Sequence, residues 1–253
     1  MMRVRFLIME ISSAIFHCSA PDLDSCPDES LPEFAFIGRS NVGKSSLLNV
    51  LAGKEALARV SPTPGFTKLI NIFTINKTWR LVDLPGYGFA QVARKDRSQF
   101  NRAVADYLEH RPNLCCVFAL IDSGLAPQKI DLEFVEWLTS HAVPYVLVFT
   151  KTDRGTPEEV RANIAAFTAC IAGWFAELPK VFQCSSATGH GRSQLLGVIA
   201  ATLDADPTEP EPAPPAAPLP PEVEPPFSLQ VRSGSSREKS QETKKRFKGA
   251  RPW

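Results

Sequence analysis

The sequence lacks the patterns that most readily identify a metal site, a disulfide framework or a membrane segment. Its six cysteines form no Cys-x-x-Cys pair and have no histidine at metal-ligand spacing, and the four histidines form no set with a nucleophile. The segment 4–16 contains Arg5 and Glu10 and has no apolar block of signal or membrane length, so we expect neither a signal peptide nor a span. These absences favour a location in the reducing cytoplasm.

The net charge is also small, +1 over 253 residues, and it conceals a strong segregation near the C-terminus. Residues 204–226 contain six acids, no base and ten prolines, whereas residues 227–253 contain eight bases and two acids. Because prolines prevent regular backbone hydrogen bonding, the first segment is predicted to be an extended linker. The second has too little apolar surface to pack a core, but it can neutralise RNA phosphates. A solubilising tail without a partner is the alternative.

The most informative pattern is a complete phosphate-binding loop between an apolar run and an amphipathic one. Glycines let the backbone wrap around phosphates, Lys44 supplies a positive charge, and the hydroxyl of Ser45 is a ligand for Mg²⁺. The full spacing in this context predicts a nucleotide site and argues against an accidental Gly-rich turn. The loop consists of Gly38, Arg39, Ser40, Asn41, Val42, Gly43, Lys44, Ser45 and Ser46.

A second motif, Thr150, Lys151, Thr152 and Asp153, follows an apolar run that we expect to be a buried strand. The carboxylate of Asp153 can accept hydrogen bonds from the ring N–H and the exocyclic amine of guanine, a pair of donors that adenine lacks. The aliphatic stem of Lys151 can lie over the base. Alone, Asp153 is equally consistent with a helix cap. Its position about 110 residues after the phosphate-binding loop favours guanine recognition.

A third motif follows the strand-like residues 79–82 and is expected to bind metal and phosphate. It consists of Asp83, Leu84, Pro85 and Gly86. Asp83 can hold Mg²⁺ through a water molecule, and the N–H of Gly86 can contact a γ-phosphate without a side chain in the way. An ordinary turn at the end of a strand is the alternative.

Two weaker segments complete the set. In 63–67 we expect Thr67 to give Mg²⁺ a second hydroxyl ligand, although only its order in the series distinguishes it from Thr63. In 184–189, which follows a short strand-like run, backbone N–H groups can reach the guanine carbonyl oxygen, but small polar residues are also ordinary turn chemistry. The expected site residues here are Gly65, Phe66, Thr67, Cys184, Ser185, Ser186 and Ala187.

Taken in order, these five segments resemble the GTPases of the translation-factor-related class, and in detail the EngB/YihA (YsxC) family of ribosome-biogenesis GTP-binding proteins. The resemblance covers about residues 14–203 and is most specific at 83–88, Asp-Leu-Pro-Gly-Tyr-Gly. It implies a cytoplasmic switch that binds GTP or GDP with Mg²⁺ and helps to mature the large ribosomal subunit, with no membrane or DNA partner. A cell-division or septation GTPase with a protein partner, and a nucleotide sensor with negligible turnover, are the alternatives.

Two residues bear on the mechanism. Many GTPases carry a glutamine just past the glycine of the metal-binding turn, where it orients the attacking water, but this chain has Tyr87. We therefore expect slow intrinsic hydrolysis and assign no certain catalytic residue. In similar GTPases an asparagine at the position of Asn41 helps to hold K⁺ beside the phosphates, which predicts K⁺ stimulation; a surface asparagine in a tight turn is the alternative. Phe66 departs from the basic residue that the family usually has there.

Apolar runs alternate with helical periods along the chain. The predicted strands are 34–37, 69–75, 79–83, 114–121, 143–149 and 180–184, and the predicted helices are 44–52, 95–110, 128–141, 157–177 and 191–203. This alternation predicts an α/β fold, a P-loop GTPase domain with a doubly wound, mostly parallel six-stranded sheet flanked by helices, in which 69–75 is an antiparallel edge strand. The expected divisions are a lead-in at 1–30, the GTPase domain at 31–203, a disordered acidic linker at 204–226 and a disordered basic tail at 227–253.

Overall fold

A computed structural model describes residues 9–54, 57, 69–87 and 94–205, with the backbone alone for 94–101. Its strands are β1 (Ala14–Ala20), β2 (Glu33–Gly38), β3 (Ile70–Ile75), β4 (Trp79–Asp83), β5 (Leu114–Asp122), β6 (Tyr145–Thr150) and β7 (Val181–Gln183). Its helices are α1 (Lys44–Ala52), α2 (Arg94–His110), α3 (Lys129–Ser140), α4 (Pro157–Ile171) and α5 (Arg192–Asp204), with a short 3₁₀ helix η1 (Ala172–Trp174) after α4.

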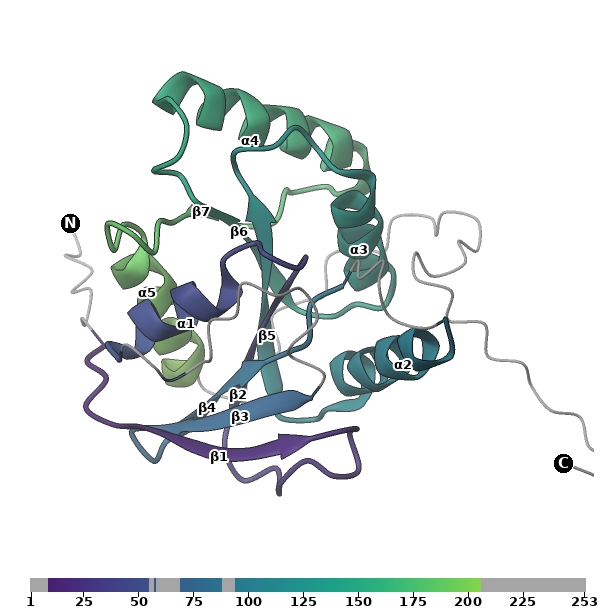
Figure 1. The fold of residues 1–253 in the computed structure, drawn as a ribbon, viewed down its shortest axis with the longest axis vertical. Helices are drawn as coiled ribbons and strands as arrows, with labels where there is room; N and C mark the ends of the chain where they lie inside the picture. The colour runs from purple at the N-terminus through teal and green to yellow at the C-terminus, as the bar shows by residue number, and fades with distance from the viewer. Residues whose placement is uncertain (1–8, 55–56, 58–68, 88–93, 206–253) are drawn as a thin grey trace, which may run out of the picture.

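In the described residues all seven strands form one sheet, in the order β1-β3-β4-β2-β5-β6-β7 (Figure 1). Pairing is parallel from β4 through β2, β5 and β6 to β7, whereas β3 is antiparallel to both of its neighbours. The carboxyl ends of the parallel strands therefore lie on one rim, where the predicted motifs begin. The predicted α/β class with a mostly parallel sheet is confirmed.

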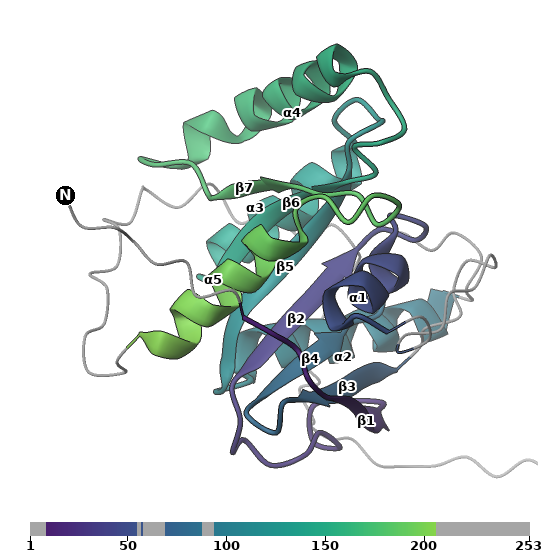
Figure 2. The same cartoon turned by 90° about the vertical axis from the view of Figure 1, so that its left-hand side faces the viewer.

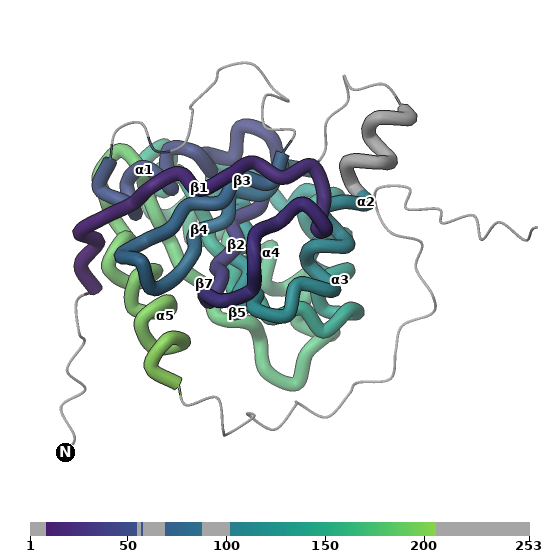
Figure 3. The backbone as a smooth tube through the Cα atoms, turned by 90° about the horizontal axis from the view of Figure 1, so that it is seen from below, coloured from purple at the N-terminus to yellow at the C-terminus, as the bar shows by residue number. Residues whose placement is uncertain are grey.

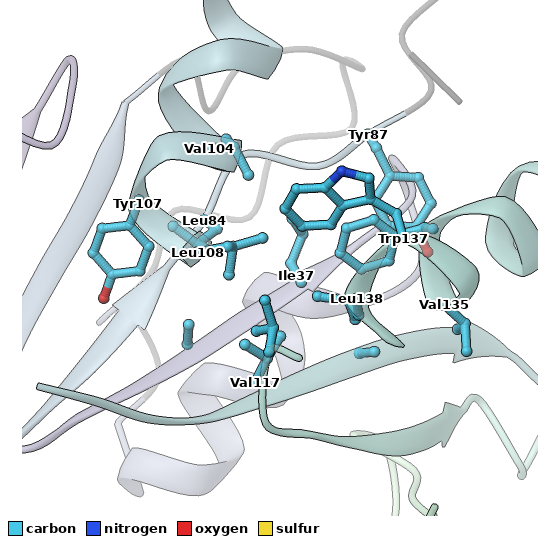
Figure 4. Close-up of a cluster of buried hydrophobic side chains, with 14 of the residues drawn as sticks. Ile37, Leu84, Tyr87, Val104, Tyr107, Leu108, Val117, Val135, Trp137 and Leu138 are labelled. Atoms are coloured by element: carbon cyan, nitrogen blue, oxygen red, sulfur yellow. The ribbon is translucent and has the colours of Figure 1, made fainter. Parts of the chain in front are cut away.

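Helices cover both faces of the sheet and create two cores. On one face, α1 and α5 pack against Phe34, Phe36 and Phe118; Figure 2 shows these two helices in front of the sheet. On the other face, α2 and α3 pack against residues that include Ile37 and Val117 (Figure 4). Successive strand residues point to opposite faces. The centre of β2 is apolar throughout because both of its faces are buried.

The start of α4 follows directly from its sequence. The hydroxyl of Thr156 accepts the N–H of Glu159 at 3.2 Å, and the carboxylate of Glu159 accepts the N–H of Thr156 at 2.9 Å, which makes a complete capping box. The predicted end of this helix at residue 177 is wrong. The α-helix ends at Ile171 and tightens into η1 around Gly173, because glycine is a poor helix former.

The sheet has seven strands where the sequence pattern predicts six, and the segment 69–75 is not at its edge. β1 pairs antiparallel with β3, from Ala14 opposite Ile75 to Ala20 opposite Ile70, and covers that edge (Figure 3). The antiparallel direction predicted for β3 is confirmed. β1 shows no regular alternation of buried and exposed residues, so periodicity does not reveal it. It is a strand because a distant segment pairs with it.

Most of the predicted linker 204–226 and all of the predicted tail 227–253 lie outside the described residues. Their disorder therefore stays a prediction, as does the division of the chain at residues 30 and 203. None of the helices in the described part of the chain is long and apolar enough to cross a membrane.

A buried cluster of charges lies at the amino end of β2. Glu33 has no exposed surface and accepts hydrogen bonds from Nη2 and Nε of Arg111 at 2.7 and 3.0 Å and from the hydroxyl of Tyr107 at 2.6 Å. Arg80 adds a contact at 3.2 Å and also pairs with Asp28. Burial by itself raises the pKa of Glu33, but the hydrogen bonds from Arg111 and Tyr107 outweigh it, so the pKa is lowered. The cluster joins β2, β4 and the end of α2.

Glu33→Gln should lower the free energy of unfolding by about 3–5 kcal/mol, because two buried guanidinium groups lose the buried carboxylate that they share. Urea denaturation measures this change. Since the pKa of Glu33 is lowered in the folded state, its stabilisation is present above the ordinary pKa of glutamate and is lost as the pH falls through the lowered value. The difference between variant and wild type should therefore shrink in acid. Glu158→Gln, which breaks an exposed pair with Arg161, is the control; equal losses in the two variants would contradict the prediction.

Candidate nucleotide-binding site

The phosphate-binding loop connects β2 to α1 with the backbone that an anion site needs. Gly43 has a φ of +99° and Asn41 a φ of +64°, both in the left-handed region. A Cβ atom at Gly38 would lie 2.7 Å from the carbonyl oxygen of Leu120, so only glycine fits there. Among the described residues no side chain caps the start of α1, and the first turn of this helix contains no acid. The first N–H groups of the helix are therefore oriented to receive an anion.

Lys44 and Asp83 bring the phosphate-binding loop and the metal-binding turn together. Nζ of Lys44 contacts Oδ1 of Asp83, and both side chains are buried. The contact arises because β2 and β4 run parallel, with Phe36 opposite Asp83. Ser45, which carries a hydroxyl group, follows Lys44 in α1. A carboxylate and a hydroxyl are oxygen ligands of the kind that Mg²⁺ prefers, with waters and phosphates completing its coordination. These residues fit a magnesium ion that binds together with a nucleotide.

Gly86 lies directly against the phosphate-binding loop. A Cβ atom at this position would be 2.7 Å from the carbonyl oxygen of Gly38 and 3.4 Å from the backbone nitrogen of Ser40, so no side chain fits. The N–H of Tyr87 donates to the same carbonyl oxygen of Gly38 at 3.3 Å. The N–H of Gly86 has no partner among the described residues. It is the group that the sequence predicts to contact a γ-phosphate.

The motif 150–153 is tied to the phosphate-binding loop. The buried hydroxyl of Thr150 donates to the carbonyl oxygen of Val42 at 2.7 Å. Lys151 has a φ of +59°, and its Nζ lies 2.6 Å from Oδ2 of Asp122 at the end of β5. A Cβ atom at Gly43 would lie 3.8 Å from Cε of Lys151, so the aliphatic stem of the lysine passes over the loop. This is the position from which the stem can cover a bound base.

Asp153 and the loop after β7 face each other. A hydrogen bond from Ser185 lowers the pKa of Asp153, so its exposed carboxylate stays ionised and acts only as an acceptor. The hydroxyl oxygen of Ser185 also accepts the N–H of Ala187 at 3.2 Å. In contrast, the N–H of Ser186 has no partner within the described ranges. Of the predicted residues 184–187, Ser186 therefore has the backbone N–H best suited to a guanine carbonyl oxygen.

These two base-side loops are joined to each other and border a cavity. The N–H and the hydroxyl of Thr152 donate to the carbonyl oxygen of Cys184 at 3.3 and 3.2 Å. A cavity of about 470 Å³ opens beside them, with Asp153, Ser185 and, from α4, Val160 among its lining residues. No residue of the phosphate-binding loop lines it. The cavity therefore borders the two base-side loops and not the phosphate-binding loop.

The structure gathers four of the five predicted segments on one rim of the sheet. The fifth, with Gly65, Phe66 and Thr67, lies outside the described residues, so Thr67 stays a predicted ligand of Mg²⁺. The side chain of Arg39 contacts α3, where its Nε donates to Asp131 at 2.9 Å. Asn41 is exposed, and its positive φ fits the tight-turn alternative without testing the predicted K⁺ site.

Sequence reasoning did not include two acids that the structure places in contact with the motifs. Asp122 carries a usable signal, because it is the last residue of an apolar parallel strand that ends on the motif rim. Asp131 carries none, because its partners Arg39 and Tyr87 lie 92 and 44 residues away in the sequence.

Comparisons with known proteins agree with this geometry. The family model described as a 50S ribosome-binding GTPase matches residues 33–151. The probable GTP-binding protein EngB of Bacteroides fragilis is 47% identical over 191 residues, which cover 76% of this chain and 95% of that protein. The chain belongs to the EngB family of GTP-binding proteins. The EngB protein of Cytophaga hutchinsonii is 48% identical over 187 residues, which cover 74% of this chain and 94% of that protein. The resemblance predicted from the motifs is confirmed.

Solved structures show the same fold. The crystal structure of a probable GTP-binding protein engB has a TM-score of 0.52 at 23% identity and covers 68% of this chain and 98% of that chain. An Era variant of Aquifex aeolicus bound to GDP.AlF4- has a TM-score of 0.55 at 22% identity and covers 75% of this chain and 62% of that one. At these identities the likeness shows the P-loop GTPase fold, which this EngB-family chain shares.

Asp153→Asn should weaken binding of GDP and favour a xanthine nucleotide, because the acceptor carboxylate becomes an amide with donor hydrogens. Isothermal calorimetry with guanosine and xanthosine diphosphates measures the exchange of preference. Glu158→Gln, which neutralises another exposed acid near the start of α4, should leave both affinities unchanged. Full retention of guanine preference by the Asp153 variant would show that another group recognises the base.

Proposed function

We propose that this chain is a cytoplasmic guanine-nucleotide switch that hydrolyses GTP slowly and assists the assembly of the large ribosomal subunit. The observation that carries the proposal is the rim itself, where a phosphate-binding loop, a metal-side carboxylate and an acidic group suited to guanine lie together. The match to a family described as ribosome-binding GTPases supports the ribosomal partner.

Each part of the rim has a role in this proposal. Lys44 and the N–H groups of the phosphate-binding loop bind the β- and γ-phosphates. The hydroxyl of Ser45 and, through a water, the carboxylate of Asp83 would hold Mg²⁺, which would neutralise charge on the phosphate oxygens. Lys151 covers the base, and Asp153 accepts hydrogen bonds from the ring N–H and the exocyclic amine of guanine. Together these groups discriminate GTP and GDP from adenine nucleotides.

The environment of Tyr87 supports slow intrinsic hydrolysis. Its side chain is buried, and its hydroxyl donates to Oδ1 of Asp131 at 3.0 Å. The ring stacks on Phe134 with 4.4 Å between the ring centres. A side chain held in this way does not replace the glutamine that orients water in other GTPases. A nucleotide sensor with negligible turnover is therefore the second candidate function. The two candidates differ in whether a partner completes the catalytic site and so raises the rate of GTP hydrolysis.

The charge of the C-terminal segment favours an RNA-rich partner over a cell-division protein. Eight bases in 227–253 provide the charge that RNA phosphates attract, and the acidic segment 204–226 can compete for them when RNA is absent. The sequence contains no comparable feature that would favour a partner in septation.

The chain should co-sediment with the large ribosomal subunit in the presence of a non-hydrolysable GTP analogue and much less with GDP. Removal of 206–253, which begins after the end of α5, should weaken this binding and reduce its dependence on salt. A full-length variant in which the eight bases of 227–253 are replaced by glutamine is the matched control for charge. Binding that ignores the nucleotide, or no binding to the subunit at all, would contradict the ribosomal role.

Hydrolysis of GTP should be faster in K⁺ than in Na⁺, and Asn41→Gly should abolish that difference. Glycine adopts the left-handed backbone of Asn41 without strain, so this variant removes the side-chain oxygen and keeps the loop. Single-turnover assays with and without the large subunit measure the rate, and GDP affinity serves as the control for loop integrity. Equal rates in K⁺ and Na⁺ for the wild-type chain would eliminate the potassium site.

A further inference from the structure

One buried carboxylate outside the predicted motifs holds two residues of those motifs. Asp131, on α3, is 1% exposed. Its Oδ1 accepts Nε of Arg39 at 2.9 Å and the hydroxyl of Tyr87 at 3.0 Å, and its Oδ2 lies 3.0 Å from the same nitrogen of Arg39. Tyr87 belongs to the apolar cluster that α2 and α3 form with the sheet (Figure 4).

The two residues that Asp131 holds are neighbours of two glycines at the phosphate end of the site. Arg39 immediately follows Gly38, and Tyr87 immediately follows Gly86. The backbones of the two segments form a parallel bridge between Arg39 and Tyr87, and the N–H of Tyr87 donates to Gly38. Asp131 therefore fixes, from the side, the two backbone segments whose glycines face each other at the phosphate end of the site.

Burying charged and polar side chains between a helix and a sheet carries a desolvation cost. Burial raises the pKa of Asp131, even though the charge of Arg39 and the hydrogen bond from Tyr87 oppose it. Burial also raises the pKa of Tyr87 well above its ordinary value, so its hydroxyl stays protonated and can donate. Apolar side chains of similar volume usually stabilise a core at least as well. The directional hydrogen bonds instead determine where Tyr87, and with it Gly86, lies.

We propose that Asp131 is a positioning residue for recognition of the γ-phosphate. By holding Tyr87 and Arg39 it keeps Gly86 against the phosphate-binding loop, where its N–H, which has no partner among the described residues, can donate to the third phosphate of GTP. The inference rests on the proposed function, because it assumes that this rim binds guanine nucleotides. GDP has no γ-phosphate, so Asp131 should affect GTP binding much more than GDP binding.

The chain offers a matched control for this idea. Tyr107 is a second buried tyrosine whose hydroxyl donates to a buried carboxylate, that of Glu33, at 2.6 Å. This pair lies at the amino end of β2, at the opposite end of the strand from the phosphate-binding loop. Tyr87→Phe and Tyr107→Phe each remove one hydroxyl from one buried carboxylate, and only the first touches the nucleotide rim.

The experiment measures the affinities of the full chain for GDP and for a non-hydrolysable GTP analogue, both with Mg²⁺. Tyr87→Phe and Asp131→Asn should each lower the ratio of analogue affinity to GDP affinity by about fivefold or more, with GDP affinity changed less than about twofold. Tyr107→Phe should reduce the melting temperature and leave the ratio unchanged. Because both substitutions act on one hydrogen bond, the double variant should lower the ratio less than the product of the two single effects.

Three results would overturn the assignment. The first is an unchanged ratio in Tyr87→Phe, the milder variant, with normal GDP binding. The second is an equal fall in Tyr107→Phe, which would attribute the effect to general loosening of the core. A wild-type chain that binds no guanine nucleotide would instead overturn the proposed function, and this assignment with it, so the two failures are distinguishable.

Discussion

The parallel pairing of β2 with β4 determines the geometry on which the site depends. With Phe36 opposite Asp83, the two strands end at the same rim and the residues that follow them meet. The backbones approach so closely that a Cβ atom at Gly86 would lie 2.7 Å from the carbonyl oxygen of Gly38. The same register puts Lys44 against Asp83. Strand pairing thus brings Lys44, Asp83 and the backbone of Gly86 to the same rim.

Buried charge lies at both ends of β2. At its amino end Glu33 gathers two guanidinium groups and a tyrosine hydroxyl, and beyond its carboxyl end Asp131 gathers Arg39 and Tyr87. The residues 34–37 between them are apolar and buried, and apolar contact has no preferred direction. Hydrogen bonds require a specific geometry. We infer that the apolar centre supplies stability, while the charged ends fix the strand relative to α2 and α3.

The predictable parts of this fold are those that neighbouring residues determine. The phosphate-binding loop needs glycines, a lysine and a serine within one short segment, and the capping box of Thr156 and Glu159 marks the start of α4 within one turn. The base-side motif is equally local. β1 is different, because pairing with β3 makes it a strand, and Asp131 is different because its partners come from other elements. A periodicity argument cannot detect contacts between residues that are far apart in the sequence.

The contacts of Tyr87 also bear on which group orients the attacking water during GTP hydrolysis. For Tyr87 to turn toward an attacking water, its ring must leave Phe134 and its hydroxyl must leave Asp131. Asp131 would then lose one hydrogen bond while Arg39 stays bound to it, and a hydrogen bond to a buried charged group contributes about 1.5–3 kcal/mol. This cost disfavours a movement of Tyr87 toward the water within the isolated chain. It favours a water-orienting group that a partner supplies, as the proposed function requires.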